Sequence, residues 1–278
     1  LNSILKKERY ENNIFVFLFI MTDLKSSNED ILNNLSIYDT IEHTTQEELP
    51  NIEKRIIANL IHGHEIAKEK IFDEHFLMET KKLMLKFMRK EDETPPISAF
   101  KGLKKDDIIM KLLLKSGLDN KKEDIVKVIF YPAPVSIADG LLSMEYHEVV
   151  SGMHLGIFPS IYEPWGYTPL ETAAQAVMSI TSDVSGFGKF VMKNSNQRKK
   201  PGILVLKTEN KKREEIVDEL TDMMYWIAKL PRKQRIEKKL QARKLSTLAD
   251  WGEFSKYYIQ AHNLAIERAA KRQKSKKR

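Results

Sequence analysis

The sequence of 278 residues contains no cysteine, which excludes disulfides and thiolate metal sites and is compatible with a reducing compartment such as the cytosol. Long apolar runs are also missing. The run from Ile14 to Met21 covers only eight residues, whereas a membrane-spanning helix needs roughly 18 or more. Residues 1–13 are polar and charged, unlike a signal peptide. We therefore expect a cytoplasmic protein without membrane contact.

Motifs for metals and for phosphate-binding loops are scarce as well. The seven histidines show no ligand spacing, and His62 and His64 are two residues apart, which would point them to different faces of a helix. The glycine-rich stretch Ser185–Gly188 is more often a plain turn than a phosphate loop. We expect no metal and no cofactor.

The net charge of +7 is concentrated in two segments. Residues 232–244 and residues 267–278 each carry seven lysines and arginines and one glutamate, so the rest of the chain is net acidic. Such runs are most often a solvated helix face or a disordered tail. An RNA-binding module is a distant hypothesis because no RNA-binding signature accompanies the charge, and we expect no nucleic-acid partner.

Apolar runs of strand length alternate with amphipathic segments of helix length. This alternation predicts an α/β fold with a mostly parallel sheet, interrupted by a helical insertion. The expected strands are residues 14–20, 126–130, 154–158, 177–181 and 203–206. The expected helices are residues 28–90, 106–115, 143–152, 169–176, 185–193, 211–229 and 232–272. The expected parts are a sheet domain (1–27 and 121–230), an insertion (28–120), a basic helix region (231–265) and a basic tail (266–278).

The most informative segment places two carboxylates, Glu163 and Glu171, eight residues apart. Thr168, Pro169 and Glu171 have the spacing of a capping box, with Thr168 as N-cap and Glu171 at the third helical position. A helix N-terminus that follows a strand can bind an anion such as a diphosphate. A capping box is more often only a helix start. The aromatics and the glycine between the carboxylates are not needed for capping, so they favour a binding site.

The segment E-P-W-G-Y-T-P-x-E, preceded by H-L-G-x-F-P-S and followed by S-I-T-S-D-V-S-G-F-G, resembles the C-terminal domain of animal and fungal glycogen (starch) synthases, glycosyltransferase family 3. The likeness extends along nearly the whole chain, through residues 15–21, 94–97, 130–132 and 232–251. It implies a GT-B fold, in which two Rossmann-like domains face each other, and this chain is the C-terminal one. The first strand, a loop with an arginine and a lysine for the donor pyrophosphate, and the acceptor-side domain would precede residue 1. We therefore expect a fragment.

The resemblance implies retaining transfer of glucose from UDP-glucose to the non-reducing end of an α-1,4-glucan, in glycogen biosynthesis. It assigns to Glu163 the catalytic role beside the donor glucose. It assigns to Glu171 the binding of the donor ribose. Tyr146 matches a tyrosine that stacks on uracil, although an aromatic that packs a helix on the sheet is equally compatible with its position. Further donor contacts are implied for Trp165, Gly166, Tyr167 and Thr168.

The basic helix is the second candidate site. Arg232, Arg235 and Lys239 are three and four residues apart, so they share one helix face and could converge on a phosphate. The resemblance implies that this helix, with His154 nearby, binds glucose 6-phosphate as an activator. Because lysine lacks the bidentate fork of arginine, we expect weaker activator binding. Three lysines stand at positions where the family usually has arginine: Lys233, Lys239 and Lys244.

Two other departures, Ala176 and Met178, stand where the family favours glycine and proline and affect a turn.

The resemblance further implies glycogen and glycogenin as partners, and a homo-tetramer formed through the insertion helices. Two hypotheses therefore stand. The chain is the donor-binding half of a glycogen synthase, active only with its N-terminal domain, or it is a non-catalytic regulatory or scaffold relative, or inactive fragment, that binds sugar phosphate or partner subunits.

Overall fold

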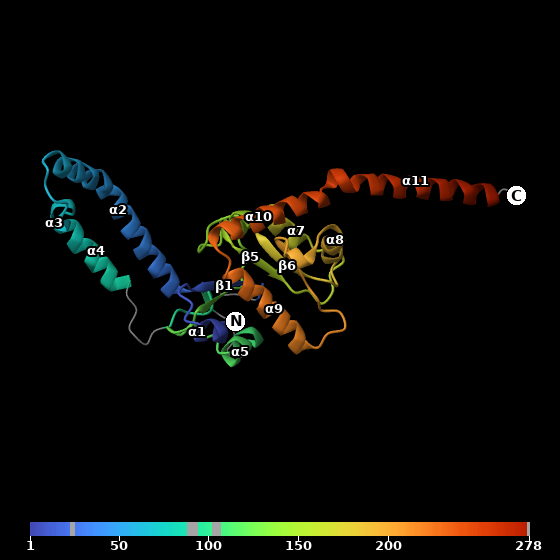
Figure 1. Cartoon of the computed structure of the whole chain (residues 1–278), viewed down its shortest axis with the longest axis horizontal. Coiled ribbons are helices and arrows are strands. Elements are labelled where there is room, and N and C mark those ends of the chain that lie inside the picture. The colour runs from blue at the N-terminus through green and yellow to red at the C-terminus, as the bar shows by residue number, and fades with distance from the viewer. Residues whose placement is uncertain (23–25, 88–93, 102–106, 277–278) are drawn as a thin grey trace. The chain divides into compact units, whose positions relative to one another are not determined.

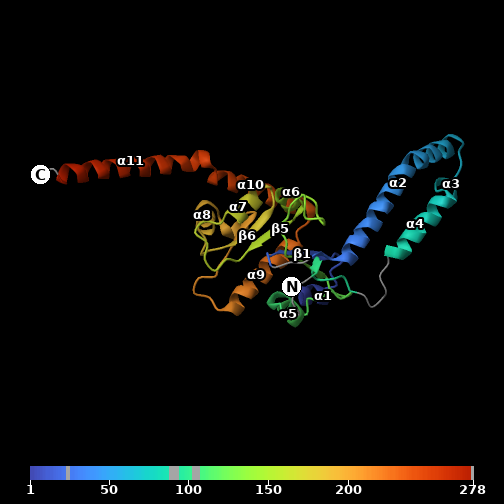
Figure 2. The ribbon, with the colours of Figure 1, turned by 180° about the vertical axis from the view of Figure 1, so that it is seen from behind.

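The computed structural model describes residues 1–22, 26–87, 94–101 and 107–276, the side chains only as far as residue 272. The chain divides into two units, Asn2–Ser143 and Met144–Arg278, each considered by itself (Figures 1 and 2). In the part of the chain that is described, no helix is long and apolar enough to cross a membrane. Both units mix helices with parallel strands, as the alternation in the sequence predicted.

In the first unit, strands β1 (Ile14–Phe19) and β4 (Val126–Tyr131) pair in parallel along their full length. This pairing confirms that the two apolar runs are strands of a parallel sheet. Val128 and Phe130 are buried and pack in one cluster with residues of α5 (Ile108–Lys115), which covers the sheet. The remaining small elements are α1 (Asn2–Lys7) and the antiparallel pair β2 (Ser26–Ser27) and β3 (Phe100–Lys101).

The first part of the predicted insertion (28–120) is helical. It contains α2 (Glu29–Ile61), α3 (Lys68–Ile71) and α4 (Glu74–Phe87), and α2 and α4 lie side by side in both views (Figures 1 and 2). The later part of this range contains β3 and α5, which pack with the sheet. Arg55 of α2 donates a hydrogen bond to the Ile71 carbonyl oxygen at 2.9 Å, which fastens α3 to α2. The histidines after α2 correct one prediction. His62 and His64 follow the helix instead of lying in it, and their ring centroids are 5.9 Å apart.

The second unit is built on a three-stranded parallel sheet in the order β5 (Leu155–Phe158), β6 (Met178–Ser182) and β7 (Ile203–Leu206). Each strand lies within one residue of its predicted range. The helices of this unit are α6 (Tyr146–Gly152), α7 (Tyr167–Ala174), α8 (Gly186–Asn194), α9 (Arg213–Ala228), α10 (Arg232–Ser246) and α11 (Trp251–Lys276), with 3₁₀ turns at Gln197–Lys199 and Thr247–Ala249.

Helices cover both faces of this sheet (Figures 1 and 2). On one face, Ile227 of α9 packs in a cluster with Met178 and Ile180 of β6. On the other, Phe187 of α8 and Ala242 of α10 pack in a cluster that also includes residues of α7 and β7. Because β6 has a neighbour on either side and helices on both faces, its residues are fully buried, as expected for a central parallel strand.

The outer side of β7 is occupied by a side chain. The Gln197 Oε1 accepts a hydrogen bond from the Val205 amide at 3.1 Å, and its Nε2 donates to the Ile203 carbonyl oxygen at 3.3 Å. These backbone groups face away from β6, because the alternate residues of β7 bond to that strand. One glutamine thus pairs with the edge strand.

Candidate functional site

The loop after β5 is fixed by the turn that starts α8. The Gly186 amide donates to the Glu163 carbonyl oxygen at 3.2 Å, and the Phe187 amide donates to the Trp165 carbonyl oxygen at 2.7 Å. Glu163 and Ser185 form a parallel β-bridge. The backbone of Glu163 is therefore held by a segment that lies more than twenty residues later in the sequence.

The side chain of Trp165 anchors the same loop. Its ring centroid lies 5.9 Å from Phe187, 5.7 Å from Phe190 and 5.4 Å from Phe254, so the half-buried indole belongs to an aromatic cluster. Aromatic pairs at these separations add to the energy of burial. The side chain of Trp165 is therefore a packing group, and its expected contact with the donor stays a prediction.

Helix α7 starts earlier than the sequence predicted. Gly166 is its N-cap with a φ of +110°, a left-handed conformation that favours glycine, and Tyr167 is the first helical residue. The predicted capping box is therefore wrong: Thr168 lies inside the helix without a capping bond, and Glu171 lies in the second turn. Pro169 fits because the first turn needs no internal amide bonds. The amides of Tyr167 and Thr168 precede the helical hydrogen-bond ladder and are available to an anion.

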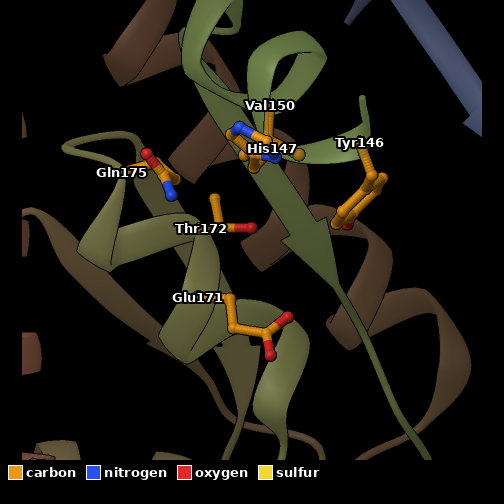
Figure 3. Close-up of a pocket in the computed structure, with 6 residues that line it drawn as sticks. All are labelled: Tyr146, His147, Val150, Glu171, Thr172 and Gln175. Carbon is orange, nitrogen blue, oxygen red and sulfur yellow. The ribbon is translucent and has the colours of Figure 1, made fainter. Parts of the chain in front are cut away.

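Tyr146 of α6 and Glu171 of α7 line one pocket with a volume of about 120 Å³. Figure 3 shows both side chains at the edge of the same space, with Thr172 above Glu171 on the same helix. Burial, and then the Glu171 carboxylate, raise the pKa of Tyr146. Two residues expected to hold one nucleoside therefore meet. Sequence reasoning missed the other lining residues, His147, Val150, Thr172 and Gln175. Val150 and Gln175 follow Tyr146 and Glu171 by four positions and could have been found by that spacing.

A cluster of cations lies at the other end of β5. His154 precedes the strand, and its pKa is lowered by burial and by the charges of Arg235 and Lys239. Lys239 Nζ donates to the Met153 carbonyl oxygen at 3.0 Å, and burial and Arg235 lower its pKa. Arg232 is exposed in the first turn of α10, and the interactions that join the other three do not include it. The structure thus brings three of the four predicted residues together.

Within the described residues, no group of three histidine, aspartate or glutamate side chains is placed to hold a metal ion.

Comparison with known proteins supports the resemblance. A family model described as glycogen synthase matches residues 1–277. The chain belongs to the glycogen synthase family. The glycogen [starch] synthase of Caenorhabditis elegans is 31% identical over 92% of this chain and 38% of its own length. Isoform 2 of Saccharomyces cerevisiae is 33% identical over 96% of this chain and 40% of its own length. The liver enzyme of Mus musculus is 31% identical over 97% of this chain. The chain therefore spans 38% to 40% of the length of these relatives.

The two departures from the glycogen synthase pattern at the end of α7 have structural explanations. Ala176 has a φ of +56°, the left-handed conformation in which glycine is preferred. Its amide donates to the Ala173 carbonyl oxygen at 3.0 Å, and the Val177 amide donates to that of Thr172 at 3.2 Å, which is a Schellman motif. Met178 is the first residue of β6, a position where proline is also tolerated. Neither departure lies among the residues that line the pocket or in the Glu163 loop.

Proposed function

We propose that this chain is the donor-binding half of a glycogen synthase, which transfers glucose from UDP-glucose to the non-reducing end of an α-1,4-glucan in the cytoplasm, with retention of configuration. One observation carries the proposal. Tyr146 of α6 and Glu171 of α7, which the family resemblance assigns to uracil and ribose, line one pocket, and the N-terminus of α7 follows the Glu163 loop.

The strand orders support a GT-B donor domain. In the doubly wound order 3-2-1-4-5-6, the first strand lies in the middle. Within each unit the longer strands run in parallel, with β1 beside β4 and with β6 between β5 and β7, as neighbouring strands of a doubly wound domain do. In this proposal residues 1–27 and 121–230 form the donor domain, and residues 28–120 are its insertion.

The proposed mechanism begins with the leaving diphosphate. The amides of Tyr167 and Thr168 at the positive end of α7 stabilise its negative charge as the glycosidic bond breaks. Glu163 accepts hydrogen bonds from the glucose hydroxyls near the reacting carbon and stabilises positive charge that develops there. Glu171 accepts from the ribose hydroxyls, and Tyr146 stacks on uracil. Held in this way, the donor is oriented for attack by the acceptor hydroxyl.

The cation cluster supports a regulatory site for glucose 6-phosphate. His154, Arg235 and Lys239 meet at the amino end of β5, where an anion would relieve their mutual repulsion. A phosphate would also form charge-assisted hydrogen bonds with the guanidinium of Arg235. Assembly into a tetramer through the insertion helices, and association with glycogenin, belong to the same proposal by family membership.

Titration of the 278-residue chain with UDP, followed by NMR, tests the donor site. Three donor contacts of about 1–2 kcal/mol each are offset by the cost of association, so we expect a dissociation constant near or above the millimolar range. Tyr146→Ala and Glu171→Ala should each weaken binding several-fold, and Tyr258→Ala on α11 should not. Equal binding by the two pocket variants and the unchanged chain would contradict the proposal.

A glycogen-labelling assay beside the titration separates the two hypotheses for the chain. We expect no glucose transfer by these 278 residues alone, since they span about two-fifths of the relatives' length. Transfer that appears when the chain is joined to the preceding portion of a relative supports the enzymatic function. UDP binding without transfer in that longer protein favours the regulatory relative.

A further inference from the structure

Two glycines in the first turn of α8, Gly186 and Gly188, have no room for a side chain. A Cβ on Gly186 would lie 2.3 Å from the Pro164 carbonyl oxygen, and one on Gly188 would lie 2.0 Å from the Ser182 carbonyl oxygen. Neither glycine has a positive φ, so backbone conformation does not require them. Close approach of another backbone segment does, in each case.

The turn that carries these glycines is fixed from the inside. Ser185 is buried, and its Oγ donates to the Ser182 carbonyl oxygen at 2.8 Å and accepts from the Gly188 amide at 2.9 Å. The Thr181 hydroxyl lies 3.0 Å from the same Oγ. Buried and fully bonded, this serine holds the turn against the carboxyl end of β6 in one conformation.

The turn Ser185–Gly188 also holds the Glu163 loop through direct contact. Gly186 touches Pro164 directly, and its amide bonds to the Glu163 carbonyl oxygen. On the other side, the Glu163 Cγ lies 3.5 Å from the place where a Cβ on Gly166 would be. Glu163 is therefore confined between the α8 turn and the start of α7.

We propose that the turn Ser185–Gly188 is a positioning element for the Glu163 carboxylate, and that Gly186 sets its distance from the donor glucose. This inference rests on the proposed function. A Cβ on Gly186 would push the Pro164 carbonyl oxygen away by about 1 Å, and a displacement of that size is enough to reduce catalysis by orders of magnitude. The neighbouring Glu163 would move with it. Tyr146 and Glu171 stand on α6 and α7, and neither contacts that carbonyl oxygen.

The inference separates the two halves of the donor. Gly186 should matter for the glucosyl group and not for the nucleoside. The test is the ratio of the dissociation constants for UDP and UDP-glucose, measured by NMR titration of the 278-residue chain. In Gly186→Ala this ratio should fall to the value of Glu163→Ala, while the dissociation constant for UDP changes less than about twofold.

Gly152→Ala is the matched control. This glycine lies in the same unit, at the end of α6, and a Cβ there would meet nothing within 4 Å. It should leave both constants unchanged. Because Gly186→Ala could prevent folding, circular dichroism is recorded for each variant. Ser185→Ala, which loosens the turn without adding atoms, serves as a second variant and should lower the ratio in the same direction by a smaller factor.

The outcomes are distinct. If the unchanged chain binds neither nucleotide, the proposed function fails and this inference falls with it. If the unchanged chain binds both and the folded turn variants keep its preference for UDP-glucose, the inference alone is overturned. It is also overturned if the unchanged chain shows no preference, or if a folded turn variant loses UDP binding to the same extent as UDP-glucose binding.

Discussion

The two ends of strand β5 carry the two candidate sites, and they are built in different ways. At the carboxyl end, Glu163 is held by backbone hydrogen bonds and by glycines that leave no space for a side chain. At the amino end, the cluster of His154, Arg235 and Lys239 consists of side chains, two of them long and flexible. The backbone-built end keeps the family motif, whereas the side-chain-built end has lysine where arginine is usual. Backbone contact tolerates few substitutions, but a charge can be kept by a different residue.

Removal of the carboxylate at the first end should have the largest effect. In a chimera that joins this chain to the preceding portion of the yeast relative, Glu163→Ala should lower glucose transfer by about a hundredfold or more, as loss of a transition-state contact does. Radiolabel transfer to glycogen measures it. Glu209→Ala, an exposed carboxylate, is the control, and retained turnover in Glu163→Ala would contradict the catalytic role.

The steric requirement at Gly188 should appear in stability. A Cβ there meets the Ser182 carbonyl oxygen at 2.0 Å, and backbone cannot move aside as a side chain can. Gly188→Ala should therefore lower the free energy of unfolding by about 2–3 kcal/mol, as overpacking does. Urea unfolding followed by circular dichroism measures the change. If Gly188→Ala lowers the free energy of unfolding no more than Gly152→Ala does, the turn has room for the added methyl group.

Ala176 departs from the family pattern in the turn that joins α7 to β6, and reversing this departure should raise stability. Because alanine is strained at a φ of +56°, Ala176→Gly should raise the free energy of unfolding by about 1 kcal/mol. Thermal unfolding detects a gain of that size. Ala174→Gly, in the last turn of the same helix, should be destabilising, which separates relief of strain from a general effect of glycine.

At the side-chain-built end, restoring the arginine should strengthen anion binding. Lys239→Arg supplies a bidentate fork, so glucose 6-phosphate should bind about three- to fivefold more tightly. Calorimetric titration measures it. Lys244→Arg, at the end of the same helix and outside the cluster, should change the affinity less, and equal gains from both variants would indicate a general charge effect.

The smallest expected effect is the pH dependence of His154. Its pKa is lowered in the folded chain, so the unfolded chain takes up the proton first and stability falls as the pH drops below about 6.5. The loss ends once the pH is below the folded pKa. Because the His154 side chain is only partly shielded from solvent, the change should be a few tenths of a kcal/mol. Urea unfolding from pH 7.5 to 5 should show it in the unchanged chain and in His262→Gln, but not in His154→Gln.

Much of the fold could be predicted because it depends on local pattern. Strand ranges followed from apolar runs, and the parallel direction of β1 and β4 followed from the alternation of strands and helices. The start of α7 could not be predicted from the sequence, because the φ of Gly166 is set by its surroundings. Glu163, Glu171 and Tyr146 were found by motif, but the role of Gly186 depends on contact with Pro164, more than twenty residues earlier. Contacts of that kind leave no local signal in a single sequence.

The bonds between Gln197 and β7 also decide where this sheet can grow. A bare edge strand invites pairing with another chain, which is a common route to aggregation. Here the side-chain amide occupies the carbonyl oxygen of Ile203 and the amide of Val205, so an incoming strand would have to displace it from these two groups. At the opposite edge, the ladders of the described residues give β5 one partner, β6. The Gln197 side chain thus hinders pairing at the β7 edge. A further strand would add more readily next to β5.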